Sequence, residues 1–502
     1  MTSPIEAKPP LSGGSESLTV RAARGVKWTT AAMIVVSVLQ FVQIATLARI
    51  LSPADFGLMA MITVVIAFGA AYADMGLSNA VIYRQDATRD QLSSLYWLNV
   101  LAGLCVFGAI VALSPAIADF YREPRLVRLL PLAGLIFVIT PFGQQFQMLL
   151  QKSLRFRLLG VVDICGAMVG AATAITCALA GLGVVSLIAG QLANTGLRVA
   201  ILAAVGWRTS RPRLRFRWRD THGYVSFGLY QMGERSINQL TANLDYLIIG
   251  RVLGPAVLGP YALAYQLVVL PIQKLNPVLT RVAFPVFALR QEDMGALRRG
   301  YCRVSGLLVF GVYPFIVGLV VLAPVVVPVL YGDRWAAAVP LVQILGCMAL
   351  FKALSNPSGS VILAIGRANV GFWLTLGVAL LAAVSFMLAV SHGGVIVVAW
   401  AWVGIAALAL SIIMLILRRL IGLTLREYFS TLRRPLAVVL LMGVIVGVSY
   451  RILGPLIPSA LVLLVVLVSL GVLAYLALWR LADRSYVRDV LHALMGRKVE
   501  AQ

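Results

Sequence analysis

The sequence predicts an all-α polytopic membrane protein with 14 transmembrane helices, built as two parallel six-helix lobes plus two C-terminal helices. Hydrophobic residues make up 60% of the 502 residues and charged residues only 12%, which is more apolar surface than a soluble domain can bury. Apolar runs of about 20 residues recur along the chain, and each is long enough to cross a bilayer as a helix. An internal repeat then divides these helices into two equivalent sets.

The repeat is clearest in two segments, ARILSPADFGLMA at 48–60 and GRVLGPAVLGPYA at 250–262. The residues that recur in register are Arg49/Arg251, Leu51/Leu253, Pro53/Pro255, Ala54/Ala256, Gly57/Gly259 and Ala60/Ala262. In both copies an apolar run ends at the arginine and a second begins just past the glycine. This pattern is typical of a turn between two helices, because a cation suits a helix C-terminus and proline and glycine interrupt a helix. We therefore expect a duplicated helical unit.

The apolar runs and the repeat give an expected order of segments along the chain. The segments are a cytoplasmic polar tail (1–27), an N-terminal six-helix lobe (28–207), a basic cytoplasmic inter-lobe linker (208–223), a C-terminal six-helix lobe (224–418), a basic cytoplasmic loop (419–434), an extra transmembrane helix pair (435–480) and a cytoplasmic tail (481–502). Each lobe holds six spans, an even number, so both lobes enter the membrane from the same side. Proline-centred breaks are expected in span four at 140–145 and in span ten at 355–359.

Lysine and arginine are distributed unevenly between the two sides of the membrane. With the N-terminus inside, the cytoplasmic segments hold 31 of them and the outward loops hold seven. This bias predicts that both termini are cytoplasmic. The most basic segment, RTSRPRLRFRWRD at 208–220, lies between two spans, where we expect it to rest against anionic lipid rather than to bind nucleic acid. The net charge of +23 therefore does not indicate a nucleic-acid partner.

The sequence offers little that would support enzymatic chemistry. The five cysteines and three histidines show no metal-ligand spacing, and no phosphate-binding loop is present, so we expect no metal and no bound cofactor. No loop is longer than roughly 25 residues, which is too short to fold as a catalytic domain. We therefore expect a protein that is not an enzyme and has no catalytic residues.

Charged side chains within the spans are the candidate functional residues, because such groups are costly in lipid and usually face a cavity or a partner. We expect four cations to bind an anionic headgroup: Arg198, Arg235, Lys274 and Lys352. Four polar side chains are expected to line the same cavity: Gln191, Asn194, Asn238 and Gln43. Three carboxylates are candidates for coupling to a proton or sodium ion: Glu234, Asp245 and Asp74. The alternative, which also applies to Asp163, is that these groups pair with one another as structural contacts.

Four segments carry a resemblance to a known family. They are ARILSPADFG, QMLLQKSLRFRLLGVVDI (147–164), SVILAIGRANVGF (360–372) and GLTLREYFSTLRRP (422–435). They resemble bacterial polysaccharide flippases of the oligosaccharidyl-lipid branch of the multidrug/oligosaccharidyl-lipid/polysaccharide exporter superfamily, near the Wzx and colanic-acid-exporter types. The resemblance covers about residues 20 to 480, and its motifs describe architecture more than a particular sugar.

The resemblance implies two lobes around a central cavity that opens alternately to each side of the bacterial plasma (inner) membrane. The implied cargo is an undecaprenyl-diphosphate-linked oligosaccharide destined for O-antigen (lipopolysaccharide), capsule or exopolysaccharide. Its implied partners are membrane lipids, a polysaccharide polymerase and a chain-length regulator. Two alternatives share the expected fold: an ion-coupled antiporter of drugs or other small molecules, and a flippase for the peptidoglycan lipid precursor. A membrane polymerase or ligase is a further alternative, but it is expected to carry a sizeable outward loop.

The repeat and the charge bias together make a testable prediction of topology. Single cysteines beside Pro53 and Pro255 should react with a membrane-impermeant thiol reagent added to intact cells, whereas a cysteine near Arg215 should react only after lysis. Labelling of only one of the two repeat turns would contradict a parallel repeat.

Overall fold

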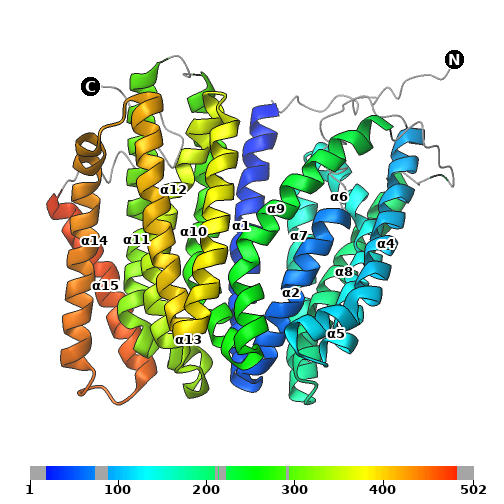
Figure 1. The fold of residues 1–502 in the computed structure, drawn as a ribbon, viewed down its shortest axis with the longest axis horizontal. Coiled ribbons are helices and arrows are strands. Elements are labelled where there is room, and N and C mark those ends of the chain that lie inside the picture. The colour runs from blue at the N-terminus through cyan, green and yellow to red at the C-terminus, as the bar shows by residue number, and fades with distance from the viewer. Residues whose placement is uncertain (1–17, 74–88, 210–212, 214–221, 290–292, 483–502) are drawn as a thin grey trace. The chain divides into compact units, whose positions relative to one another are not determined.

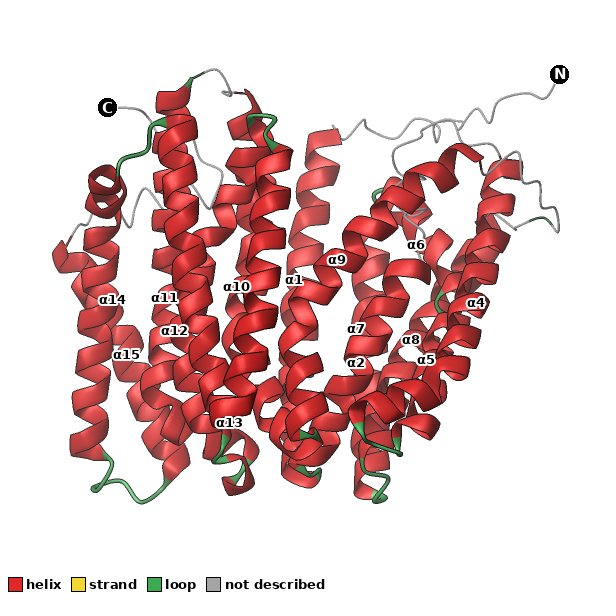
Figure 2. Cartoon of the chain, viewed as in Figure 1, coloured by secondary structure: helices red, strands yellow, loops and turns green. Residues whose placement is uncertain are grey.

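A computed structural model of the chain describes residues 18–73, 89–209, 213, 222–289 and 293–482. Every regular element in these ranges is helical (Figure 2). The helices are α1 (Leu18–Ile50), α2 (Pro53–Ala73), α4 (Arg89–Tyr121), α5 (Leu126–Ile139), α6 (Pro141–Lys152), α7 (Phe156–Leu179), α8 (Val184–Thr209), α9 (His222–Leu253), α10 (Pro255–Leu289), α11 (Met294–Tyr331), the 3₁₀ turn η2 (Asp333–Trp335), α12 (Ala338–Ala364), α13 (Ala368–Ile421), α14 (Leu425–Leu453) and α15 (Ala460–Ala482) (Figure 1).

These helices account for the predicted membrane spans. Eleven of the described helices are long and apolar enough to cross a membrane, and the bent pair α5–α6 makes a twelfth candidate. One of the eleven, α13, is two helices in line, because Gly394 (φ 69°, ψ −158°) breaks the helical backbone. The helix at predicted span seven, α9, is too polar to be counted among the eleven. Each predicted span therefore coincides with a helix, a half of α13 or the bent pair, and the all-α polytopic prediction is confirmed.

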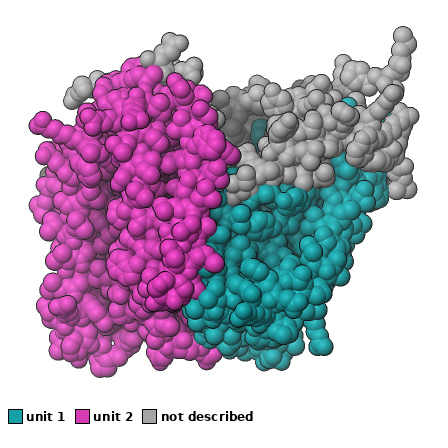
Figure 3. All heavy atoms as spheres, in the orientation of Figure 1, with its two compact units in different colours: residues 1–259 teal, residues 260–502 magenta. Residues whose placement is uncertain are grey.

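The chain divides into two compact units, residues 1–259 and residues 260–502 (Figure 3). The first unit extends past the basic linker expected at 208–223 and includes α9. The division into six-helix lobes at that linker was inferred from the sequence repeat, and it stays a prediction.

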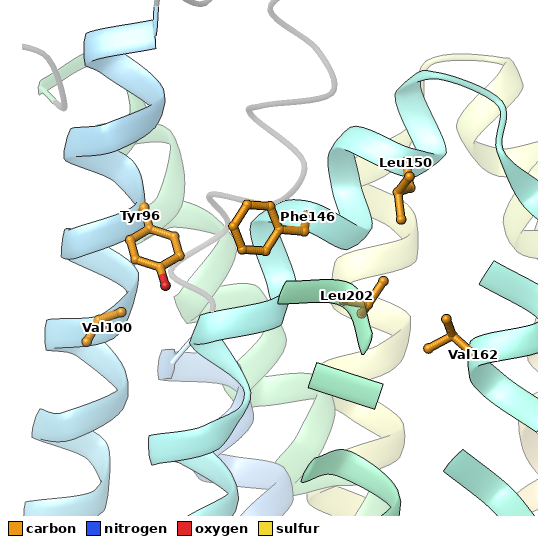
Figure 4. Close-up of a cluster of buried hydrophobic side chains, with 6 residues drawn as sticks. All are labelled: Tyr96, Val100, Phe146, Leu150, Val162 and Leu202. Atoms are coloured by element: carbon orange, nitrogen blue, oxygen red, sulfur yellow. The ribbon is translucent and has the colours of Figure 1, made fainter. Parts of the chain in front are cut away.

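In the first unit, α7 packs against α8 and α1, α4 packs against α5, and α2 packs against α9. The short helix α6 is held by its aromatic side chain Phe146, which is 1% exposed. Figure 4 shows Phe146 directed toward Tyr96 of α4, and the two ring centroids are 6.1 Å apart. Leu202 of α8 and Val162 of α7 complete this buried apolar cluster, which ties four helices together.

In the second unit, α11 is the central helix and contacts α12, α14 and α15, while α12 also packs against α13. Asp293 caps the start of α11, since its carboxylate accepts the backbone N–H of Ala296 at 2.9 Å. A buried cluster that includes Leu322, Met442 and Leu467 joins α11 to the C-terminal pair α14 and α15.

The two repeat turns have matching local structure. Both second helices begin at a proline, Pro53 in α2 and Pro255 in α10, where proline's fixed φ suits the first helical position. In the first copy the side chain of Ser52 accepts the backbone N–H of Asp55, whose carboxylate accepts the backbone N–H of Ser52. In the second copy Gly254 replaces the serine and adopts a φ of 77°, a conformation that glycine reaches without strain.

The two turns also contact each other reciprocally within the first unit. A Cβ atom placed on Gly57 would overlap the carbonyl oxygen of Pro255, and a Cβ on Gly259 would overlap the carbonyl oxygen of Pro53. The equivalent glycine of each copy thus allows the backbone of the other copy to approach closely. This contact explains why glycine recurs at this position of the repeat.

The structure confirms one of the two predicted proline-centred breaks and contradicts the other. The break predicted in span four is confirmed, because α5 and α6 meet at Pro141 with a bend of 43°. The break predicted at 355–359 is wrong, because α12 continues through Pro357. Two serine hydroxyls beside Pro357 bond to carbonyls of the same helix: Ser355 donates to the Phe351 carbonyl at 3.0 Å and Ser358 to the Ser355 carbonyl at 2.6 Å.

Two helices begin earlier in the chain than the apolar pattern indicates. The first helix, α1, begins at Leu18, within the tail expected at 1–27. Similarly, α14 begins at Leu425, within the loop expected at 419–434. Thr424 caps α14 by accepting the backbone N–H of Glu427 at 3.2 Å.

The reciprocal contact predicts that neither repeat glycine tolerates a side chain. Gly57→Ala and Gly259→Ala should each destabilise the protein by at least the roughly 1–3 kcal/mol typical of overpacking, because the obstructing atoms belong to the backbone. The measurement is the midpoint temperature of thermal unfolding in detergent. Gly108→Ala and Gly404→Ala, where an added Cβ meets no atom within 4 Å, are matched controls and should leave the midpoint nearly unchanged. Equal midpoints for all four variants would contradict the contact.

Candidate functional site

Small residues bring α7 and α8 close together in the first unit. Gly166, Gly170 and Ala174 follow one another at intervals of four on α7, and Gly190 and Asn194 follow the same interval on α8. A Cβ on Gly170 would lie 2.7 Å from the Asn194 Cβ, and one on Gly190 would lie 2.6 Å from the Ala174 Cβ. Such small-residue stripes let helix backbones approach in a membrane, where packing replaces the hydrophobic effect.

This close approach places Arg198 against α7. Its aliphatic stem crosses Gly166, where an added Cβ would be 2.5 Å from the Arg198 Cγ. The guanidinium Nη2 lies 2.8 Å from Oδ1 of Asp163 on α7, and the two side chains are 35% and 45% exposed. Arg198 is thus one of the cations expected to bind an anionic headgroup, and the structure pairs it with a carboxylate. A role of Arg198 in binding a headgroup stays a prediction. For the alternative, a structural ion pair, the structure identifies Asp163 as the partner.

A second cation, Lys352, lies among aromatic side chains in the second unit. Its Nζ donates to the hydroxyl oxygen of Tyr265 at 3.0 Å. It also lies 5.5 Å from the ring centroid of Tyr265 and 5.8 Å from that of Trp402. These distances are within the range of cation–π attraction, which stabilises an ammonium group away from bulk water. Three helices, α10, α12 and α13, therefore hold one half-buried lysine.

The carboxylate of Asp245 on α9 is fully buried in the first unit, with 0% of the residue exposed. Its Oδ1 accepts the backbone N–H of Tyr246 at 2.9 Å. One helical turn and a half earlier, Gln239 donates to the Ala67 carbonyl of α2 at 3.4 Å, so a polar face of α9 contacts α2. A buried carboxylate on a helix that packs inside the protein is a reasonable ion-coupling group, and that role stays a prediction.

For the other predicted site residues, the structure gives at most the helix and the exposure of the side chain. Gln43 on α1, Asn194 on α8 and Lys274 on α10 are half-buried, whereas Gln191 and Asn238 are exposed. Gln191 lies on α8 seven residues before Arg198, and its side chain is exposed. Glu234 and Arg235 belong to α9, but their side chains lie outside the described part of the structure, as does the whole of Asp74.

The structure adds polar residues that the sequence interpretation did not single out. Tyr265 and Trp402 contact Lys352, and Asn99 of α4 donates to Gln144 of α6 at 3.2 Å. The pair Asn99 and Gln144 lies beside the bend at Pro141. Residues on different helices are not related by a fixed spacing in the sequence. The only sequence signal for these residues is a polar side chain within an apolar run.

Between the end of α8 and the start of α9, the described residue of the basic linker is Arg213, and it is attached to α4. The backbone N–H of Arg213 donates to Ser93 at 3.1 Å, and its carbonyl accepts the indole N–H of Trp97 at 3.0 Å. Its guanidinium lies 3.0 Å from the carboxylate of Asp90. This point of the linker is therefore fixed against the protein, while the remaining residues of 210–221 lie outside the described ranges.

The helical architecture defines a multi-pass membrane protein with charged side chains within its spans. The family of polysaccharide biosynthesis proteins matches residues 46–340, which is more than half of the chain. The chain belongs to this family.

Two relatives and one solved structure agree with this assignment. The teichuronic acid biosynthesis protein TuaB of Bacillus subtilis is 35% identical over 86% of this chain and 90% of its own length. The lipopolysaccharide biosynthesis protein WzxC of Escherichia coli is 34% identical over 71% of this chain and 72% of its own. The lipid II flippase MurJ, in an inward closed conformation, superimposes with a TM-score of 0.72 over 92% of this chain and 99% of its own, at 12% identity. The last comparison shows a shared fold, and the resemblance to polysaccharide flippases is confirmed by the family and the relatives.

The pair Asp163–Arg198 gives a prediction that separates pairing from cargo binding. Arg198→Ala should lower the thermal midpoint, by an amount equivalent to about 1 kcal/mol, because Asp163 loses its partner in a half-buried position. The charge swap Asp163→Arg/Arg198→Asp should restore the midpoint if pairing is the main role. Polysaccharide export by the swapped protein then reports whether a cation is needed specifically on α8. A swap that is as unstable as the single variant would contradict the pairing.

Proposed function

We propose that this protein translocates a polyprenyl-diphosphate-linked oligosaccharide from the inner to the outer leaflet of the bacterial plasma membrane. The observation that carries the proposal is the family membership, together with long matches to proteins named for the biosynthesis of two different surface polysaccharides. Teichuronic acid and lipopolysaccharide differ in their sugars, so the property that their biosynthesis proteins share is more plausibly the handling of a common lipid carrier than of a particular sugar. The fold of a lipid II flippase supports the same inference.

The physical requirement for such a carrier fits the composition of the helices. A diphosphate with its sugars cannot cross hydrocarbon unaided, so it needs a polar route that provides cations, while its polyprenyl tail stays in lipid. The four lysine and arginine residues within the predicted spans supply the cations, and alternating access of two lobes supplies the route. The carboxylate of Asp245, with those of Glu234 and Asp74, is the expected means of coupling transport to a proton or sodium gradient.

Lys352 is the described cation best suited to contact the diphosphate. Its described contacts include the rings of Tyr265 and Trp402 and the Tyr265 hydroxyl, which hold the ammonium group at a half-buried position. An ammonium group binds phosphate oxygens as a point charge, and the aromatic faces hold it without neutralising it. Tyr265 and Trp402 are positioning residues in this proposal.

A groove in the second unit has the character needed for the polyprenyl tail. It has a volume of about 410 Å³ and lies between α11 and the turn that joins α14 to α15. Val325 and Leu463 provide apolar lining, and Tyr450 and Arg451 add polar groups. A lipid tail beside a polar end is the arrangement that a lipid-linked cargo requires, which gives the extra helix pair a role in receiving it.

The proposal is tested by replacing Lys352 in cells that lack the native copy. Lys352→Ala should reduce polysaccharide export about tenfold or more, since a hydrogen bond to a charged group contributes about 1.5–3 kcal/mol. Lys352→Glu should abolish export, and Lys352→Arg should keep most of it. Export is measured as polysaccharide at the cell surface, and protein level is measured by immunoblot. Arg128→Glu, at an exposed position in the first turn of α5, is the control and should export normally. Normal export by Lys352→Glu at normal protein level would contradict an anionic cargo at this residue.

A further inference from the structure

The first ten residues of α14, segment 425–434, form a helix with three distinct faces. In Figure 1 these first turns are seen nearly end-on, whereas the rest of α14 runs down the page. Pro435 lies inside α14, directly after this segment, and proline is a common cause of a helix kink. The segment therefore crosses the ends of the neighbouring helices rather than continuing along them.

One face of the segment is fixed to the second unit. Tyr428 is 1% exposed and Leu432 is 0% exposed. The ring of Tyr428 stacks on that of Tyr301 in α11, with centroids 5.7 Å apart. The carboxylate of Glu427 lies 3.8 Å from Arg298, which also donates to the Gly422 carbonyl at 3.3 Å. The segment is thus held in one place before any partner binds.

The neighbouring face is apolar and exposed. Leu425 and Phe429, one helical turn apart, are 52% and 57% exposed. Beyond Pro435 the same helix exposes Leu440 and Val444, each at 61%. The apolar surface of the segment is therefore continuous in sequence with a helix whose exposed side chains suit lipid tails.

The third face is basic. Arg426 and Arg433 are seven residues apart, so they lie on one side of the helix, next to Leu425 and Phe429. Arg418 and Arg419 are exposed at the end of α13, just before the segment. The one carboxylate of the segment, Glu427, already lies near Arg298, so it does little to neutralise these arginines.

We propose that segment 425–434 is an interfacial helix that binds the headgroups of anionic phospholipids through Arg426 and Arg433. Leu425 and Phe429 enter the boundary between headgroups and acyl chains, while the arginines reach the phosphates beside them. Charge complementarity selects anionic lipid, and the lipid-exposed side chains farther along α14 favour a lipid surface over a soluble partner. Because Tyr428 and Glu427 already fix the helix, binding does not have to order it. This inference is independent of the proposed cargo.

The test uses the full-length protein purified in an uncharged detergent and titrated with phosphatidylglycerol or phosphatidylcholine. Bound lipids are counted by native mass spectrometry. Each arginine near an anionic surface contributes about a fivefold change in affinity, so Arg426→Ala/Arg433→Ala should weaken phosphatidylglycerol binding roughly 30-fold. Binding of phosphatidylcholine should be unchanged. Arg426→Lys/Arg433→Lys keeps the charges and should retain most of the binding.

The matched control is Arg122→Ala/Arg128→Ala, which removes one exposed arginine from the turn after α4 and one from the first turn of α5, and it should bind phosphatidylglycerol like the wild type. Wild-type affinity in Arg426→Ala/Arg433→Ala would overturn the proposal. An equal loss in the control would also overturn it, because the effect would then follow from net charge. If the variant changed the monomer–dimer ratio without losing lipid, the face would be a contact between copies of this chain, and the lipid proposal would be wrong. A monodisperse elution profile of every variant excludes unfolding as the cause.

Discussion

Lipid offers no hydrogen-bonding partner to the backbone, and this constraint governs both the fold and the placement of its polar groups. Each segment must satisfy its own N–H and C=O groups, so every regular element in the described ranges is a helix. The same constraint makes the exceptions informative. Two serine hydroxyls bond to carbonyls of α12 beside its proline, and two charges within spans have described partners, a carboxylate for Arg198 and aromatic rings for Lys352.

The order and number of helices could be predicted from the sequence because span length and charge bias are properties of the chain itself. The repeat predicted the matching turns, and their reciprocal contact at Gly57 and Gly259 supplies the reason for the conserved spacing within the chain. The errors have local causes. A proline within an apolar run indicates a possible break, but the sequence does not tell whether the helix bends there: Pro141 bends its span and Pro357 does not interrupt α12. The start of α14 was missed because its first turns are charged, and burial of Tyr428 stabilises them instead.

The charged residues of the candidate site could be predicted from the sequence, but their contact partners could not. Arg198 and Lys352 could be predicted because each is a basic residue within an apolar run. The free-energy cost of placing a charge in lipid depends on the residue type, so it can be inferred from the sequence. Their partners lie on other helices, and no period in the sequence connects Arg198 with Asp163 or Lys352 with Tyr265 and Trp402. Helix packing decides those pairs, and it depends on small residues such as Gly166, whose importance is visible only when the neighbouring helix is in place.

The polarity of α9 has a consequence for how the protein is made. Its fully buried Asp245 would add about 2.5–3.5 kcal/mol to the free energy of inserting this helix on its own, and α9 is not among the helices apolar enough to insert unaided. Its packing partner α2 is synthesised well before it, so α2 is already in the bilayer when α9 leaves the ribosome. The packing of α9 on α2 thus gives the polar helix a partner that is synthesised before it. A defect in α2 would then appear during synthesis as a failure to integrate the middle of the chain.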